Sequence, residues 1–182
     1  MNTWGRYAPG GFTLRTVSHL LKMAALAAVA LPAAAGDFDQ VLSAVRKVWP
    51  ERSQIAVVCD ANGSKAAINS LASAAGGMKI SVMDVKGPQD IGKILAALSG
   101  KKPDFIVLIP GDRVAGEGQP GASFIIQRMA TLKVPVVATS EAGVKQGAVM
   151  GMGPTTGSRL LSNAKAAALA GVALPDGAVP VT

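Results

Sequence analysis

Histidine and tyrosine are almost absent from this chain of 182 residues, and both occur near its start. The one histidine is His19 and the one tyrosine is Tyr7, so residues 36–182 contain neither type. Histidine is the commonest general acid–base catalyst and metal ligand because its pKa lies near neutrality. The sequence therefore excludes histidine-dependent catalytic triads and zinc sites from residues 36–182, and we expect no resident metal or cofactor.

Cysteine is equally scarce, with Cys59 as the single example. One cysteine forms no intramolecular disulfide and no cysteine-rich metal cluster. Cys59 ends the apolar run 55–59, and no histidine is present there to lower its pKa. We expect Cys59 to be a buried core thiol rather than a nucleophile.

A basic stripe with interspersed aromatic side chains is also missing. The chain has 18 basic and 11 acidic residues, and the basic ones are scattered. The aromatic side chains after residue 35 are Phe38, Trp49, Phe105 and Phe124. Nucleic-acid-binding proteins usually combine clustered positive charge with stacking aromatics. The sequence therefore predicts no nucleic-acid partner.

Residues 1–35 have the pattern of a secretory signal peptide. A start without acidic residues carries Arg6, Arg15 and Lys22, an apolar segment follows at 23–31, and alanines at 33–35 precede Gly36. The apolar segment is shorter than the roughly 20 residues that span a bilayer. We expect export to the periplasm with cleavage of this leader, and retention as a loose inner-membrane anchor is the alternative.

The remaining residues, roughly 150, predict one domain. We assign 1–35 to the signal peptide, 36–53 to an N-terminal helix and linker, and 54–182 to a single α/β domain. Apolar runs predict strands at 54–59, 79–85, 104–109, 134–139 and 148–152. Helical spacing predicts helices at 37–48, 64–75, 88–98 and 156–170, and a further helix with Phe124, Ile125, Met129 and Leu132 on its inner face.

Alternation of strands with crossover helices predicts an α/β fold, a three-layer sandwich with a mostly parallel five-stranded sheet. Ligands of such open sheets bind at loops that follow the carboxyl ends of the strands. Here these loops are 60–64, 85–88, 110–112 and 139–143. The glycine-rich stretch 111–121 lacks the Gly-Lys-Ser/Thr ending of a phosphate-binding loop, so we expect a flexible surface loop.

Short polar side chains in the strand-end loops are the candidate ligand-binding residues. They are Asp60, Asn62, Ser64, Asp112, Thr139 and Ser140. Each of the first four also has a local interpretation. Asp60 and Asn62 suit a turn, Ser64 suits a helix cap, and Asp112 can accept hydrogen bonds from its own loop.

Four segments carry a resemblance to a known family. They are the strand 55–59 with its Asx-containing turn, the run 104–112, the run 134–140 and the run 144–153. Their order resembles one lobe of the ABC-transporter substrate-binding proteins with the type I periplasmic binding protein fold. The resemblance covers residues 54–181 and implies that the six candidate residues approach a ligand cleft. Family members are about twice as long and close two lobes around a ligand.

Three functional hypotheses remain open. In the first, the chain is an exported, non-enzymatic domain that binds a small solute as, or derived from, a component of an ABC transport system, and a homodimer or a partner supplies the missing wall. In the second, it is an interaction module that has lost solute binding and docks on a permease or another envelope protein. In the third, it is a hydrolase that uses Ser64 or Ser140 with Lys65 or Lys145 as base.

Overall fold

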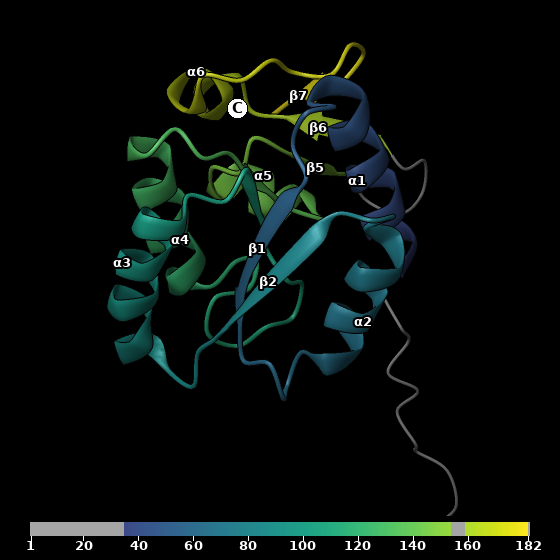
Figure 1. Ribbon diagram of the computed structural model, residues 1–182. Coiled ribbons are helices and arrows are strands. Elements are labelled where there is room, and N and C mark those ends of the chain that lie inside the picture. Colours follow the sequence, from purple (N-terminus) through teal and green to yellow (C-terminus); the bar gives the residue numbers. More distant parts are fainter. Residues whose placement is uncertain (1–34, 154–158, 182) are drawn as a thin grey trace, which may run out of the picture. The chain divides into compact units, whose positions relative to one another are not determined.

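The computed structural model describes residues 35–153 and 159–181 (Figure 1). Within these residues, seven strands form one sheet in the order β2-β1-β3-β4-β5-β6-β7. Neighbouring strands are parallel except for β5 and β6, which are antiparallel. The signal peptide predicted for residues 1–35 lies outside the described residues apart from Ala35.

The strands and helices alternate along most of the chain. The strands are β1 (Gln54–Cys59), β2 (Lys79–Asp84), β3 (Phe105–Val107), β4 (Val136–Val137), β5 (Met150–Met152), β6 (Leu160–Ser162) and β7 (Val179–Pro180). The helices are α1 (Ala35–Val48), α2 (Lys65–Ala74), α3 (Ile91–Lys101), α4 (Pro120–Thr131), α5 (Glu141–Gln146) and α6 (Ala164–Ala170). A 3-10 turn, Pro88–Asp90, leads into α3.

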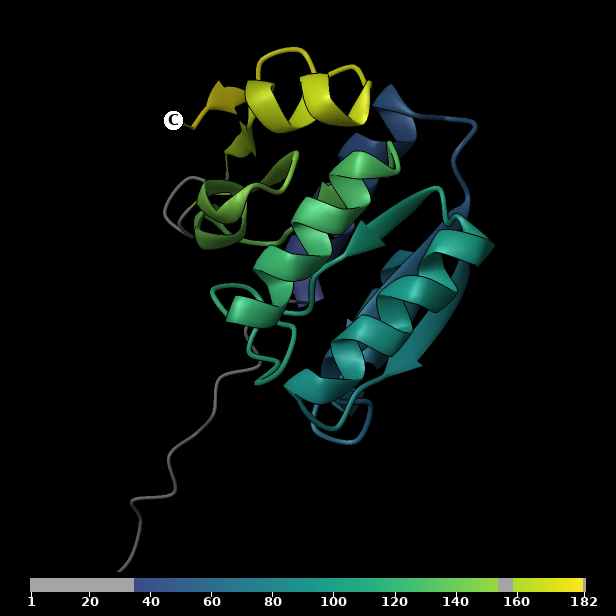
Figure 2. The same ribbon diagram turned by 90° about the vertical axis from the view of Figure 1, so that its left-hand side faces the viewer.

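Strand β1 is buried on both faces, which explains its continuous apolar sequence. Ile55, Val57 and Cys59 pack into a core with α1 and α2. Ala56 and Val58 point to the opposite face and join a second core with α3 and α4. Figures 1 and 2 show the two pairs of helices on opposite faces of the sheet. The α/β three-layer architecture predicted from the sequence is therefore confirmed.

Helix α1 packs into the same core as the sheet. Phe38, Val41, Leu42 and Val45 recur at spacings of three and four residues and are fully buried. Beyond the helix, the Trp49 indole donates a hydrogen bond to the carbonyl of Ala173 at 3.0 Å. The predicted amphipathic helix at 37–48 is thus present, and it begins slightly earlier.

Among the residues that the structure describes, the sheet has seven strands rather than the five predicted. The predicted helix at 156–170 was wrong in part, because Leu160–Ser162 forms β6 and α6 begins at Ala164. The first part of this prediction, 156–158, lies outside the described residues. Asn163 separates the two elements, and its side chain accepts a hydrogen bond from the Ala166 N–H at 3.0 Å. Strands of two or three residues, such as β6 and β7, are too short to show a period of two, so pairing alone defines them.

Two other local predictions also need correction. The stretch between the predicted strands 134–139 and 148–152, for which no helix was predicted, contains helix α5. Phe124 is 61% exposed, whereas Ala122, Ile125, Ile126 and Met129 form the buried face of α4. Phe124 therefore lies outside the core despite its apolar ring. Throughout residues 35–153 and 159–181, helices fall short of the length and apolar character that crossing a bilayer requires.

Candidate functional site

The carboxyl ends of β1 and β3 bring Asp60 and Asp112 together. The two strands are parallel neighbours, so the loops that follow them lie at the same edge of the sheet. The Asp60 backbone N–H donates to Asp112 Oδ2 at 2.8 Å, and the Ser64 hydroxyl donates to the same oxygen at 2.7 Å. Three predicted site residues therefore meet, although about fifty positions separate Asp112 from the other two.

Asp112 uses both carboxylate oxygens within the protein. Its Oδ1 accepts the backbone N–H groups of Val114 and Ala115 at 3.0 and 2.8 Å, and the residue is 4% exposed. Asp112 therefore fixes the loop after β3, in line with its local interpretation. Val114 and Ala115 are buried, which corrects the expectation that 111–121 is a surface loop throughout.

Ser64 also differs from its local interpretation as a helix cap. It stands at the N-cap position of α2, but its side chain makes no capping hydrogen bond there. Its hydroxyl donates to Asp112 instead. The Ser64 hydroxyl therefore acts as a donor to a carboxylate 48 positions away, and its oxygen accepts no capping hydrogen bond from the helix N–H groups.

A hollow of about 280 Å³ lies at this edge of the sheet. Its lining residues are Asp60, Gly63, Ser64, Gly111, Asp112 and Arg113. Asn62 does not line it and is exposed in the turn after β1. The hollow is slightly smaller than the ~300–1,000 Å³ of typical ligand pockets. A complete ligand pocket at this position therefore needs a further wall.

Two cations flank the hollow and contact the buried Asp60 carboxylate. Lys86 Nζ lies 3.0 Å from Asp60 Oδ1 and 2.9 Å from Asp84 Oδ1. Arg113 Nη2 lies 2.8 Å from Asp60 Oδ2. Both basic side chains are at least half exposed, so they retain donors that face solvent. This arrangement combines a carboxylate with two cations, which suits a charged polar solute.

The ion pairs shift the ionisation of this cluster. The hydrogen bond from Lys86 is the largest cause that lowers the pKa of Asp60 and of Asp84 below the ordinary value of 3.8. The hydrogen bonds to Asp84 and Asp60 in turn raise the pKa of Lys86 above 10.5. All three groups therefore keep their charges at neutral pH.

Replacing Lys86 by methionine is expected to raise the pKa of Asp60 and Asp84 towards 3.8, as measured by NMR titration of the side-chain carboxyl carbons. In the native chain these lowered pKa values stabilise the fold above about pH 4, and this contribution is lost as the pH falls through them. The raised pKa of Lys86 acts oppositely, since its contribution is lost only as the pH rises through that value.

Lys93→Met provides the control for the Lys86 titration, because Lys93 is an exposed lysine on α3. We expect this variant to leave the two aspartate pKa values where they are in the native chain. Equal values in the native chain and Lys86→Met would contradict the ion-pair assignment.

Cys59 lies beside this cluster and is fully buried, as the sequence predicted. Burial, followed by the negative charges of Asp112, Asp84 and Asp60, raises the pKa of Cys59 to about 12. The thiol is therefore protonated at neutral pH and is a poor nucleophile.

Thr139 and Ser140 lie after β4 and contact Glu117, which the sequence did not mark as a site residue. The Thr139 backbone N–H and hydroxyl both donate to Glu117 Oε1, at 2.5 and 2.8 Å. The Ser140 hydroxyl donates to Glu117 Oε2. Because β3 and β4 are neighbours, this group lies next along the same sheet edge. The polar groups predicted to face a ligand therefore bind a carboxylate of the chain itself.

The hydroxyls of the hydrolase hypothesis have acidic partners. Ser64 donates to Asp112 and Ser140 donates to Glu117, while Lys145 pairs with Glu141 at 2.7 Å. A serine nucleophile needs a base that accepts its proton, and neither hydroxyl donates to a lysine in these contacts. Among residues 35–153 and 159–181, no three His, Cys, Asp or Glu side chains are grouped so that they could hold a metal ion.

Three residues of this edge were not predicted from the sequence, for different reasons. Lys86 and Arg113 lie in or beside loops that the sequence marked as strand ends, but scattered charges gave no reason to choose them. Glu117 stands in the glycine-rich loop ahead of α4, and no sequence signal connects it with β4. Only the fold of that loop brings its carboxylate to Thr139.

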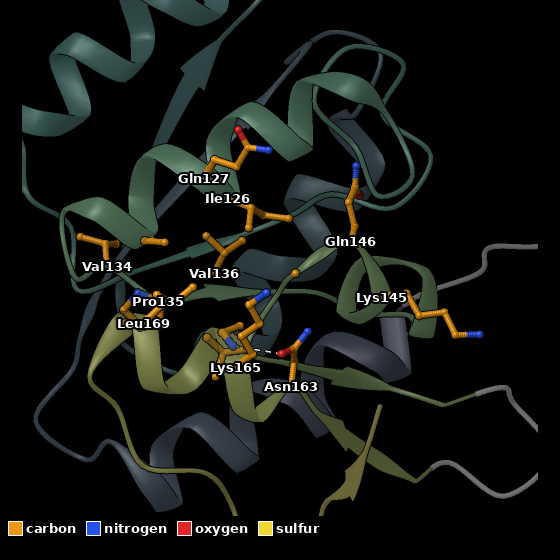
Figure 3. A pocket seen from close by; sticks show the side chains of 15 residues that line it. Ile126, Gln127, Val134, Pro135, Val136, Lys145, Gln146, Asn163, Lys165 and Leu169 are labelled. Atoms are coloured by element: carbon orange, nitrogen blue, oxygen red, sulfur yellow. Dashed lines mark hydrogen bonds between the residues drawn. The ribbon is translucent and has the colours of Figure 1, made fainter. Parts of the chain in front are cut away.

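Two larger cavities lie away from the converging polar residues. One of about 350 Å³ is lined by α4, the start of β4 and α6, including Ile126, Pro135 and Leu169 (Figure 3). It is near the amino end of β4, whereas Thr139 follows the carboxyl end. Another of about 620 Å³ lies between α1 and residues of the C-terminal segment. We place the candidate site at the strand-end hollow because the charged and polar groups converge there.

Comparison with known proteins identifies the fold. No family model and no curated protein matches this chain. A conserved domain protein from Vibrio cholerae superposes with a TM-score of 0.69 at 18% identity, covering 80% of this chain and 60% of that one. An ABC domain in complex with L-Trp from Streptococcus pneumonia gives a TM-score of 0.67 at 15% identity, covering 80% of this chain and 62% of that chain.

A third solved structure, the ligand-free, open form of a substrate binding protein with adhesive properties from Clostridium difficile, gives a TM-score of 0.69 at 16% identity. The superposition covers 79% of this chain and 59% of the chain of that protein. The described residues thus have a periplasmic-binding-protein-like α/β fold and form a single lobe. The chain spans about 60% of the length of these structures.

Proposed function

We propose that this chain is a non-enzymatic, exported domain that binds a small polar solute at the carboxyl edge of its sheet. One observation carries the proposal. Asp60, Lys86 and Arg113, which follow three different strands, make ion pairs beside the hollow that Ser64 and Asp112 complete. The likeness in fold to a substrate binding protein and to a domain in complex with L-Trp supports it.

The charges at the hollow suggest the chemistry of the solute. Asp60 accepts hydrogen bonds from an amine, and Lys86 and Arg113 donate to a carboxylate. A small solute that carries both kinds of group would exchange the internal ion pairs for equivalent pairs with itself. Asp112 has a supporting role in this proposal, because its oxygens already accept four hydrogen bonds.

We further propose that a second polypeptide supplies the opposing wall. Solute-binding pockets bury most of their ligand's surface, and a hollow of about 280 Å³ at one sheet edge covers one side. A second copy of the chain would supply this wall in a homodimer, and an ABC permease or another envelope protein would supply it in a transport complex. The basic start and apolar segment of residues 1–31 support action in the periplasm.

Native mass spectrometry tests this proposal. The full chain is expressed with its own leader, and the exported protein is purified from the periplasm. We expect a retained small molecule that is lost from Arg113→Ala and from Lys86→Met. Arg128→Ala on α4 and Lys93→Met on α3 remove exposed basic residues elsewhere and should keep it. Absence of any retained solute, or equal retention by all four variants, would contradict solute binding at this edge.

A second candidate function has one observation in its favour. The acceptors of Asp112 and the donors of Thr139 and Ser140 are all satisfied within the chain. A domain that had lost solute binding would show such internal pairing, and its remaining role would be docking on an envelope protein. Co-purification of one envelope protein with ligand-free chain, disrupted by substitutions at the same edge, would favour this interaction module.

A further inference from the structure

Glu117 contacts the end of β4 as a bound carboxylate ligand would. Its Oε1 accepts the Thr139 N–H and hydroxyl at 2.5 and 2.8 Å, and its Oε2 accepts the Ser140 hydroxyl. Both oxygens of the carboxylate are thus used by donors from two consecutive residues. Hydrogen bonds from neutral donors to a charged acceptor are stronger than those between neutral groups.

The groups that bind the Glu117 carboxylate are held in place by other contacts. The Ala138 N–H donates to the Met150 carbonyl at 2.9 Å, which fixes the strand just before Thr139. The Gly143 N–H donates to Ser140 Oγ at 3.4 Å and joins that side chain to α5. A side-chain carbon at Gly143 would lie 2.3 Å from Ala138 Cβ, so α5 packs closely against the end of β4 beside this carboxylate. We therefore expect this pocket to persist without Glu117.

The loop that carries Glu117 is likewise anchored on both sides of this residue. Upstream, the Gly116 N–H donates to the Asp112 carbonyl at 3.2 Å. Downstream, the Gly118 N–H donates to Gln146 Oε1 at 2.9 Å. Glu117 itself is partly exposed. Its side chain can consequently leave the pocket by rotation about its own bonds while the loop backbone stays in place.

We propose that Thr139 and Ser140 form a carboxylate-binding subsite that the chain's own Glu117 occupies, and that a ligand carboxylate binds there by displacing this side chain. The inference rests on the proposed function for its biological meaning, since the subsite lies on the same sheet edge as the hollow. Two oxygens in one plane match the observed donors, so the ligand class is a carboxylic acid. Glu117 then acts as a tethered competitor that selects for ligands able to replace it.

Acetate is a suitable probe because it reproduces the carboxylate end of Glu117. In Glu117→Ala, we expect acetate to raise the melting temperature saturably, by roughly 3–5 °C at ten times its Kd, relative to chloride at equal ionic strength. The native chain should show no such rise over the same concentrations. The double variant Glu117→Ala with Thr139→Val should show a smaller rise than Glu117→Ala, because valine keeps the shape of threonine but removes one of the three donors.

A local readout separates binding in the subsite from general salt effects. Acetate should shift the amide resonance of Thr139 in Glu117→Ala and leave it unchanged in the native chain. Glu117→Gln keeps the shape of the side chain, so it provides the same measurement if the alanine variant does not fold. We expect its response to acetate to be smaller than that of Glu117→Ala, because the glutamine side chain still fills the subsite. Equal acetate responses in the native and variant chains, or no response in either variant, would overturn the inference.

The acetate experiment and the solute experiment can fail independently. Without an acetate effect, but with a solute whose retention depends on Arg113, the proposed function stands and the carboxylate subsite is wrong. With a specific acetate effect, but no retained solute, the subsite stands as a property of the fold and the solute-binding proposal is wrong.

Discussion

Replacing Asp112 by alanine is expected to lower the free energy of unfolding by about 4 kcal/mol. The native carboxylate accepts hydrogen bonds from three backbone N–H groups, those of Asp60, Val114 and Ala115, and from the Ser64 hydroxyl. Alanine would leave these buried donors without an acceptor, and a buried unsatisfied donor is costly. Equilibrium unfolding in urea, analysed by linear extrapolation, measures the loss.

The matched variants make this prediction specific. Asp112→Asn retains one acceptor oxygen, so we expect roughly half of the alanine effect. Asp176→Ala removes an exposed carboxylate from the C-terminal segment and should change stability by less than about 0.5 kcal/mol. A loss below about 1 kcal/mol in Asp112→Ala would mean that the loop after β3 does not depend on this carboxylate.

Gly116→Ala is expected to destabilise the chain by about 3 kcal/mol or more. A side-chain carbon at this position would lie 2.3 Å from the Asp112 carbonyl oxygen and 2.8 Å from the Ile109 carbonyl oxygen. Both are backbone atoms of the same turn, so relief requires the loop itself to move. That movement would also displace Glu117, which is the next residue, from Thr139. Urea unfolding reports the first effect and the Thr139 amide resonance reports the second.

Gly92→Ala is the control for that substitution, because the same methyl group is added where space is open. Apart from its own neighbours and the backbone of its own helix, no heavy atom lies within 4 Å of a side-chain carbon built at Gly92, which is inside α3. Alanine is favoured over glycine in a helix by up to about 1 kcal/mol, so this variant should be unchanged or more stable. Similar losses in Gly116→Ala and Gly92→Ala would show that the close approach at Gly116 is unimportant.

The sequence predicted the elements whose residues repeat with a clear period. The apolar run 54–59 marks β1 because that strand is buried on both faces, and the spacing of Phe38, Val41, Leu42 and Val45 marks α1 because one face of the helix is buried. Strand β6 has three residues and β7 has two, so neither offers enough positions for a period. Their assignment depends on hydrogen bonds between strands.

The candidate site was predictable in position but not in its bonding. Because parallel strands end at a common edge, Asp60, Ser64 and Asp112 could be expected to meet, and they do. Their partners could not be read from the chain. Ser64 looked like a local helix cap, yet its hydroxyl donates to Asp112, 48 positions away.

For this protein, the sequence by itself determined the order of strands and helices from α1 to β4, the two-sided burial of the central strand and the absence of histidine chemistry after residue 35. These properties depend on residue type and on short-range periodicity, which the chain carries locally. Only the tertiary structure decided that Lys86 and Arg113 pair with Asp60 and that Glu117 fills the donors after β4. Such contacts join loops that are distant in sequence, so they exist only once the sheet has brought its strand ends together.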